Sequence, residues 1–235
     1  MKRISEVSCA CLVKEHTTIK AEKIVKILRN FIDLKNANIL DVGTGTGQVA
    51  HELSKVSKSV TSIDVVDERT VKKGYGFNLV NSEKIPFESK KFDVVISNQV
   101  IEHIRNQQEH IDEMYRVCKK NGLCFIGTPN KWWYKDVHYH LPLITLMPRW
   151  LANKYMRLFK KNKDYDIYPL SYFELKKMTK KFSIFNNVSI DVIKRPDYYG
   201  LDIMKSLHPI SKRTPNIILK IFNLVFPAYL IVLKK

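Results

Sequence analysis

The stretch NILDVGTGTGQVA, residues 38–50, joins a short apolar run to three glycines at alternate positions and then to a helical pattern. Glycine-rich turns between a strand and a helix hold several classes of nucleotide-like ligand. A dinucleotide-binding turn has the spacing G-x-G-x-x-G, whereas Gly43, Gly45 and Gly47 give G-x-G-x-G. No Gly-Lys-Ser/Thr follows, so the pattern of a Walker A loop is missing as well. The turn therefore favours a ligand that places no phosphate here.

Two carboxylates accompany this turn. Asp41 stands two residues before the first glycine, and Asp64 ends the next apolar run, VTSID. A carboxylate at Asp41 disfavours a nearby pyrophosphate and suits a cation. A carboxylate in the place of Asp64 can accept hydrogen bonds from both hydroxyls of a ribose. S-adenosylmethionine, which carries an ammonium and a sulfonium and no phosphate, fits both carboxylates.

Helical and strand-like segments alternate around the turn. This alternation predicts one α/β domain over residues 1–235, built on a parallel sheet with helices on both faces. Ser171 and Glu174 form a predicted capping box, and Asn121-Gly122 is a predicted helix stop. We expect helices at residues 19–31, 47–54, 109–119, 171–180 and 216–226, and strands at 39–42, 60–64, 92–97, 123–127, 188–194 and 228–233.

Residues 131–170 interrupt the alternation with a segment rich in aromatic residues, His and Pro, and we expect them to form a lid over the carboxyl ends of the strands. Within this lid, PRWLANKYMRLFKKNK at residues 148–163 predicts a basic amphipathic helix. Its expected apolar stripe consists of Leu151, Tyr155, Leu158 and Phe159. Such a helix can lie on an anionic membrane, cover a substrate or pack on its own domain.

Composition limits the remaining possibilities. The 235 residues carry a formal net charge of +17, which attracts phosphate-bearing partners such as RNA, anionic lipid or lipid-linked substrates, although a merely solvated surface explains it equally well. The four cysteines show no zinc-ligand spacing, so we expect no metal site. The first residues lead into no apolar signal segment, and the apolar run at 217–233 is interrupted, so we expect a cytoplasmic protein.

Four segments together resemble the class I S-adenosylmethionine-dependent methyltransferases. They are ILDVGTGTG, VTSIDVVD, NSEKIPFESKKFDVVISNQVIEHI and MYRVCKKNGLCFIGTPN, in the order and spacing of that family. The resemblance implies a doubly wound, mostly parallel, Rossmann-like sheet whose last strand is antiparallel, and it implies S-adenosylmethionine as the cofactor. Two residues depart from the usual pattern, since Asn81 stands where the family often has Asp and Ser62 where it often has Gly.

The resemblance also implies which residues bind the cofactor. The methionine part of the cofactor would be held at the glycine turn, by Asp41, Gly43, Thr44, Gly45 and Gly47. The ribose would be held by Asp64 and Val65, and the adenine would lie beside Asn81 and Ser82. Ser97 and Asn98 would lie near the methyl group that is transferred.

The acceptor side is expected near the Glu102-His103 pair. A hydroxyl acceptor must lose its proton, and a His with a pKa near neutrality is the usual base, so His103 is the catalytic candidate. Glu102 is expected to contact the acceptor. His138 and His140 are expected to help shape the acceptor site, because alternation in an extended segment would put both on one side.

The leading hypothesis is a methyltransferase that acts on a small molecule, on a hydroxyl of a sugar or a lipid-linked intermediate. Such an enzyme would be located in the cytoplasm, and it could associate peripherally with the inner face of the membrane. An RNA methyltransferase is an alternative suggested by the charge, but the chain has no recognisable RNA-binding module. A third possibility is a scaffold protein that binds the cofactor without turnover.

Overall fold

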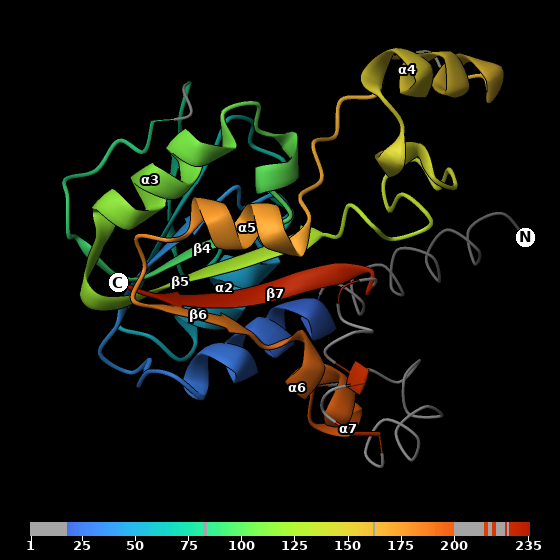
Figure 1. Cartoon of the computed structure of the whole chain (residues 1–235). Helices are drawn as coiled ribbons and strands as arrows, with labels where there is room; N and C mark the ends of the chain where they lie inside the picture. Colours follow the sequence, from blue (N-terminus) through green and yellow to red (C-terminus); the bar gives the residue numbers. More distant parts are fainter. Residues whose placement is uncertain are drawn as a thin grey trace, which may run out of the picture.

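A computed structural model describes residues 18–81, 84–161, 163–199, 214–215, 218–219, 224 and 226–235. Within these residues, seven strands form one sheet in the order β3-β2-β1-β4-β5-β7-β6, with helices on both faces (Figure 1). The strands are β1 (Asn38–Val42), β2 (Ser59–Asp64), β3 (Gly76–Leu79), β4 (Phe92–Asn98), β5 (Cys118–Pro129), β6 (Ile184–Asn187) and β7 (Ala228–Lys234).

The sheet is parallel from β3 to β5, and β7 runs antiparallel to both of its neighbours, β5 and β6. This is the doubly wound, mostly parallel fold with an antiparallel last strand that the sequence predicts. The strand order reverses between β1 and β4, which lie side by side with Val42 opposite Ser97. In such sheets ligands bind outside the carboxyl ends of the strands at this reversal. The fold therefore places the glycine turn after β1 at the expected binding edge.

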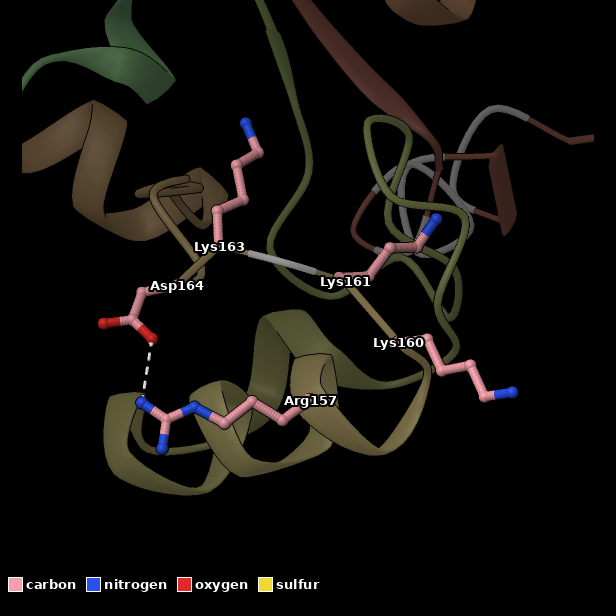
Figure 2. Close-up of a pocket in the computed structure, with 5 residues that line it drawn as sticks. All are labelled: Arg157, Lys160, Lys161, Lys163 and Asp164. Carbon is pink, nitrogen blue, oxygen red and sulfur yellow. Dashed lines mark hydrogen bonds and ion pairs between the residues drawn. The ribbon is translucent and has the colours of Figure 1, made fainter.

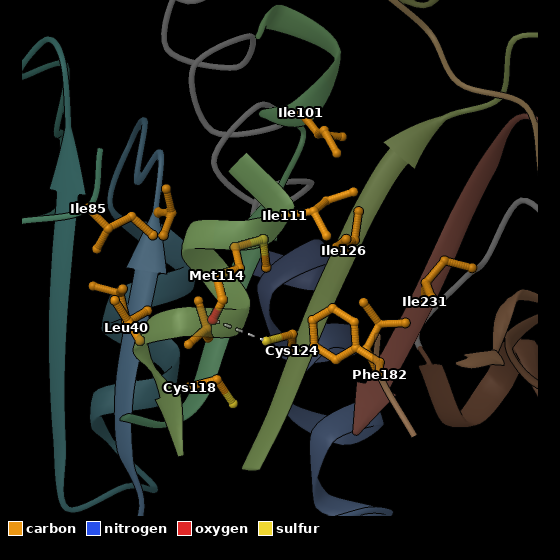
Figure 3. Close-up of a cluster of buried hydrophobic side chains, with 14 of the residues drawn as sticks. Leu40, Ile85, Ile101, Ile111, Met114, Cys118, Cys124, Ile126, Phe182 and Ile231 are labelled. Atoms are coloured by element: carbon orange, nitrogen blue, oxygen red, sulfur yellow. Dashed lines mark hydrogen bonds between the residues drawn. The ribbon is translucent and has the colours of Figure 1, made fainter. Parts of the chain in front are cut away.

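Apolar side chains cover both faces of the sheet. Consecutive strand residues point to opposite faces, so Leu40 belongs to one buried cluster and Ile39 to the other. Figure 3 shows the first cluster, in which β1, β5 and β7 meet helix α3 (Gln107–Val117). The second cluster joins the other face to α2 (Gln48–Ser54), to α6 (Ser189–Lys194) and to the helix at residues 18–29.

The segment at residues 131–170 has a small hydrophobic core of its own. It contains the 3-10 turn η2 (Ile144–Leu146) and helix α4 (Arg149–Leu158), and Figure 1 shows α4 standing apart from the sheet. The buried residues of this core are Leu141, Ile144, Ala152, Met156, Tyr165 and Ile167.

The helix expected within residues 148–163 is present as α4, but most of its expected apolar stripe does not pack on the insertion. Ala152 and Met156 are the residues that α4 buries, whereas Leu158 is 75% exposed and Phe159, just beyond the helix, is 48% exposed. Of the expected stripe, Tyr155 packs against the small core of the segment beside Ala152 and Met156, whereas Leu151 and Leu158 are exposed. α4 therefore presents large apolar side chains outward.

The predicted strand at residues 188–194 is also wrong. Residues 189–194 form α6, and β6 ends just before it at Asn187. The side chain of Asn187 accepts a hydrogen bond from the backbone N–H of Ser189 at 3.1 Å, which turns the chain out of the strand. A short apolar run does not distinguish a buried strand from a buried helix, and here local turn chemistry decided.

Other differences are smaller. α3 ends at Val117, and residues 118–122, including the predicted helix stop, belong to β5. β3 was not predicted, because its sequence GFNL is only four residues long and contains only two large apolar side chains. The predicted capping box at Ser171 is confirmed at the start of α5 (Tyr172–Met178). The predicted helix at 216–226 lies mostly outside the described residues. Among the described helices, none has the length and apolar character needed to cross a bilayer.

Candidate functional site

A cavity of about 460 Å³ lies at the carboxyl ends of β1 and β2. The glycine turn after β1, the end of β2 and the segment after β4 supply most of its wall. Val80 and Ile85 add an apolar part of the wall, and His110 of α3 adds a polar one. Of the residues expected to bind a cofactor or an acceptor, Gly43, Gly45, Asp64, Val65 and His103 line this cavity.

The glycine turn needs its glycines for two different reasons. Gly43, Gly45 and Gly47 all have positive φ, at 71°, 49° and 82°, which is the left-handed region that favours glycine. A Cβ on Gly43 would overlap Val100, and one on Gly47 would overlap Tyr75 and Val71. A Cβ on Gly45, in contrast, would meet no atom within 4 Å. The space above Gly45 is therefore open, and Gly45 lines the cavity.

The side chain of Asp64 connects the end of β2 to this turn through hydrogen bonds. One carboxylate oxygen accepts a hydrogen bond from the Gly45 backbone N–H at 2.9 Å, and the other accepts one from the Val65 N–H at 2.7 Å. The side chain is only partly buried and lines the cavity. Each oxygen has further lone pairs that can accept from a ligand hydroxyl. This geometry fits the ribose hydroxyls of an adenosine.

Asp41 lies beneath the turn and is not a lining residue. It is 2% exposed and accepts a hydrogen bond from the Thr44 hydroxyl at 2.8 Å. Burial raises the pKa of Asp41 to about 6, and the charge of Asp64 adds to this rise. Asp41 and Thr44 therefore stabilise the turn from within, and any effect of Asp41 on a cationic ligand acts through its charge.

At the end of β4, the residues that reach the cavity are not the ones predicted. Ser97 is fully buried and hydrogen-bonded to His110 Nε2 at 2.9 Å, and Asn98 packs against Gly127. Instead Gln99, whose φ is 60°, and Val100 form the wall. Burial lowers the pKa of His110 to about 4, so its ring is neutral. Nothing in the sequence marked His110, which lies thirteen residues after its partner Ser97.

The adenine side also differs from expectation. Asn81 is exposed and is not a lining residue, and Ser82 lies outside the described residues. The apolar residues Val80 and Ile85 occupy the wall on either side of them. The backbone N–H of Ile85 donates to Glu113 at 2.9 Å, and Glu113 is held by Arg116. This part of the wall offers apolar surface for a flat ring.

Glu102 and His103 sit on the 3-10 turn η1 (Ile101–His103) directly after this wall. Glu102 is fully buried, and one of its oxygens accepts from the Thr128 hydroxyl at 3.0 Å. Its other oxygen lies 3.8 Å from His138 Nε2. Burial raises the pKa of Glu102 to about 7. Glu102 therefore lies behind the cavity wall and does not line the cavity itself.

His103 lines the cavity, and its ring meets the ring of His138 edge to face at 4.9 Å between centroids. Burial lowers the pKa of His103, and repulsion from His138 lowers it further. Ligand atoms of Glu102, His103 and His138 lie within 4.8 Å of one another, so this group could hold a divalent cation. The sequence predicts all three residues at the acceptor site but predicts no metal site there.

His140 does not join this group. Residues 137–139 form a turn, so the extended geometry expected for His138 and His140 is wrong. The turn is fixed by Asp136, whose carboxylate accepts from the N–H groups of His138 and Tyr139 at 3.0 and 2.6 Å. His140 is exposed with φ of 58°, and it makes no hydrogen bond, ion pair or ring contact with Glu102 or His103.

Comparison with known proteins agrees with this geometry. Residues 16–181 match the family described as "Methyltransferase domain". "Ubiquinone biosynthesis O-methyltransferase" of Rickettsia prowazekii is 36% identical over 122 residues, 48% of each chain. The protein of that name from Pelagibacter ubique is 30% identical over 118 residues, 46% of this chain and 49% of the relative. The chain thus spans about half the length of these curated relatives.

A solved structure, an S-adenosylmethionine-dependent methyltransferase from Methanosarcina mazei, superposes with a TM-score of 0.54 at 16% identity. The superposition covers 89% of this chain and 96% of that one, and at this identity it supports the fold alone. The family match covers more than half of the chain, and the open turn at Gly45 with the carboxylate of Asp64 fits the cofactor. The chain therefore belongs to the methyltransferase domain family, with the fold and the cofactor of the class I S-adenosylmethionine-dependent enzymes.

Proposed function

We propose that this protein transfers a methyl group to a hydroxyl of a small molecule, either a sugar or a lipid-linked intermediate. The observation that carries the proposal is the position of His103 on the same cavity as Gly45 and Asp64. A hydroxyl must lose a proton during methylation, and His103 offers an imidazole in the described wall, whose pKa is lowered by burial and by His138. The two relatives named above are O-methyltransferases, which supports a hydroxyl acceptor.

Gly43, Gly45 and Asp64 would hold the cofactor, with Val65 and the apolar wall beside them. When bound, S-adenosylmethionine supplies an electrophilic methyl group. The chain itself aligns the acceptor, excludes water and takes the proton. A lowered pKa keeps the ring of His103 neutral near pH 7, so one ring nitrogen is free to accept the acceptor proton.

Hydrogen bonds connect the insertion to the segment that carries Glu102 and His103. The N–H of Tyr168 donates to the backbone oxygen of Glu102 at 2.7 Å. The side-chain amide of Gln107 donates to both Ile101 O at 2.9 Å and Tyr168 O at 2.7 Å. His138 brings a second imidazole from the insertion to His103. We therefore assign the insertion the role of a lid that forms one wall of the acceptor site.

An anionic or lipid-linked acceptor agrees with the charge of this lid. Residues 149–166 contain six cationic and two acidic side chains. Cations close to an acceptor site raise the local concentration of anionic substrates. We propose on this basis that the enzyme associates peripherally with the inner face of a membrane, where a lipid-linked acceptor presents its polar group.

Two measurements test the proposed function. Isothermal titration calorimetry should show binding of S-adenosylmethionine, and failure to bind would exclude the enzyme. Turnover should then be measured with hydroxyl acceptors, namely sugars, lipid-linked sugars and catechol-type quinone precursors, with structured RNA as the contrasting substrate. Methylation of RNA alone would contradict the proposal, and binding without turnover on any acceptor would favour a scaffold.

A further inference from the structure

The outward face of α4 carries apolar side chains that the fold leaves uncovered. Trp150 is 63% exposed, Leu158 75% and Leu151 38%. At 100° per residue these three positions lie within about one third of the helix circumference, opposite Ala152 and Met156. A soluble helix normally turns its large apolar side chains inward. α4 follows this only in part: Tyr155 packs against the core of the insertion, whereas Trp150, Leu151 and Leu158 are exposed.

Cations surround this apolar face. Lys154 lies on the same face, with Nζ 5.4 Å from the ring centre of Trp150. Beyond the helix, a second cavity of about 480 Å³ is lined by Arg157, Lys160, Lys161, Lys163 and Asp164. Figure 2 shows these cationic side chains spreading apart from one another.

Most of this charge is not neutralised within the chain. Arg157 pairs with Asp164 at 3.4 Å, and Lys163 pairs with Asp166 at the same distance. Within the described ranges, no carboxylate forms an ion pair with Lys154, Lys160 or Lys161. The apolar face is thus bordered by cations that are free to meet an external anion.

The insertion connects this face to the acceptor side of the cavity. The guanidinium of Arg149, at the start of α4, stacks 3.9 Å from the ring centre of Tyr168 and donates to Tyr165 O. Tyr168 in turn donates to the backbone of Glu102. A surface that binds α4 would therefore lie at a fixed place relative to the acceptor site.

We propose that the outward face of α4 is a docking surface for an anionic lipid bilayer. Trp150, Leu151 and Leu158 enter the interface between headgroups and acyl chains, while Lys154, Lys160 and Lys161 contact lipid phosphates. The inference rests on the proposed function, because it names the surface through which the enzyme reaches a lipid-linked acceptor. A second copy of the chain is the poorer occupant, since a symmetric contact would bring the same cations together.

Vesicle co-sedimentation of the full chain tests this inference. Vesicles of equal parts phosphatidylcholine and phosphatidylglycerol should retain the protein at low salt, and vesicles of phosphatidylcholine alone should not. Added salt should weaken the retention, because it screens the charges. Loss of Trp150 and Leu158 in a W150A/L158A variant should reduce partitioning by about tenfold or more. Loss of two lysines in K160A/K161A should reduce it by about tenfold or more as well.

Matched controls separate this face from general charge and hydrophobicity. Ile184→Ala removes an apolar side chain that is 50% exposed on β6, away from the insertion. The K35A/K58A variant removes two exposed lysines that precede β1 and β2, at the opposite end of the sheet. Both controls should partition like the wild type. Equal losses in the controls, or no retention of the wild type on anionic vesicles, would overturn the inference.

Two further readouts keep the outcomes distinct. Calorimetry with S-adenosylmethionine should give the same affinity for every variant, so a loss of vesicle binding alone bears on the docking surface and a loss of cofactor binding bears on the proposed function. Light scattering should show the same molecular mass with and without Trp150 and Leu158. A concentration-dependent dimer that the W150A/L158A variant loses would replace the bilayer with a second copy.

Discussion

The carboxyl group of Glu102 lies 3.8 Å from His138 Nε2 and accepts a hydrogen bond from Thr128 on its other oxygen. The oxygen that faces His138 makes no hydrogen bond within the described chain. Such a buried carboxyl group favours its neutral form, which is why the pKa rises to about 7. Glu102 therefore changes its charge in the physiological range, beside the two histidines of the site.

Glu102→Gln should change the pH dependence of stability. Glu102 is protonated in the folded state up to about pH 7, whereas in the unfolded chain it ionises near its ordinary value of 4.5. The unfolded state then binds fewer protons, so the wild-type free energy of unfolding falls as the pH rises from about 4.5 to about 7, by up to about 3 kcal/mol. Gln cannot titrate, so the variant lacks this component of the fall.

Urea denaturation at a series of pH values measures this difference. The variant should gain stability relative to the wild type as the pH rises, and the gain should stop above about pH 7. Glu88→Gln, an exposed acid outside the site, serves as the control and should follow the wild type. A constant difference between Glu102→Gln and the wild type across the range would show that Glu102 is already ionised when folded.

His103→Ala should lower kcat by about 10²–10⁴-fold, because it removes the proposed general base. Affinity for S-adenosylmethionine should not change. In the wild type, kcat/KM should rise with pH to a plateau, and the midpoint of the rise should lie below the ordinary His pKa, because burial and His138 lower the pKa of His103. The measurement is a pH–rate profile with an accepted hydroxyl substrate, and the exposed His140→Ala is the control.

Two results would contradict the base assignment for His103. The first is undiminished turnover by His103→Ala. The second is loss of turnover in the presence of a chelator with recovery upon addition of a divalent metal, since Glu102, His103 and His138 are close enough to share an ion. In that case the imidazole is a ligand, and the acceptor proton leaves by another route.

The sequence predicted the parts of the fold that depend on local patterns. Apolar runs located β1, β2, β4 and β7, and the glycines with Asp64 lie at the edge of the sheet where the cavity is found. The failures arose where tertiary packing decides. The insertion buries Ala152 and leaves Leu158 exposed, and the sequence pattern alone did not show which face of the helix packs inward. The sequence did not indicate His110 or Thr128, because His110 contacts Ser97 and Thr128 contacts Glu102 only once the sheet has formed.

Asp64→Ala should weaken the affinity for S-adenosylmethionine by about ten- to a hundredfold, because hydrogen bonds to a charged acceptor contribute about 1.5–3 kcal/mol. Asp64 also holds the Gly45 N–H, so circular dichroism must show that the fold persists. Asp64→Asn, which keeps one acceptor oxygen, should lose less. Asp33→Ala, an exposed acid outside the cavity, is the control for calorimetry. Unchanged affinity in Asp64→Ala would refute the ribose assignment.

Alanine substitutions at Gly47 and Gly45 should separate an effect on the stability of the fold from an effect on cofactor binding. Gly47 has φ of 82° and no room for a Cβ beside Tyr75 and Val71, so Gly47→Ala should lower the free energy of unfolding by about 2–5 kcal/mol. Gly45 has φ of 49° but open space above it, so Gly45→Ala should cost only about 1–2 kcal/mol.

The methyl group of Gly45→Ala points into the space assigned to the cofactor. Affinity for S-adenosylmethionine should therefore fall by about tenfold or more, although the fold persists. Urea denaturation and calorimetry on the same two variants check both effects. If Gly45→Ala bound the cofactor as the wild type does, the ligand would not occupy the open side of the turn, and the cofactor would have to be placed elsewhere in the cavity.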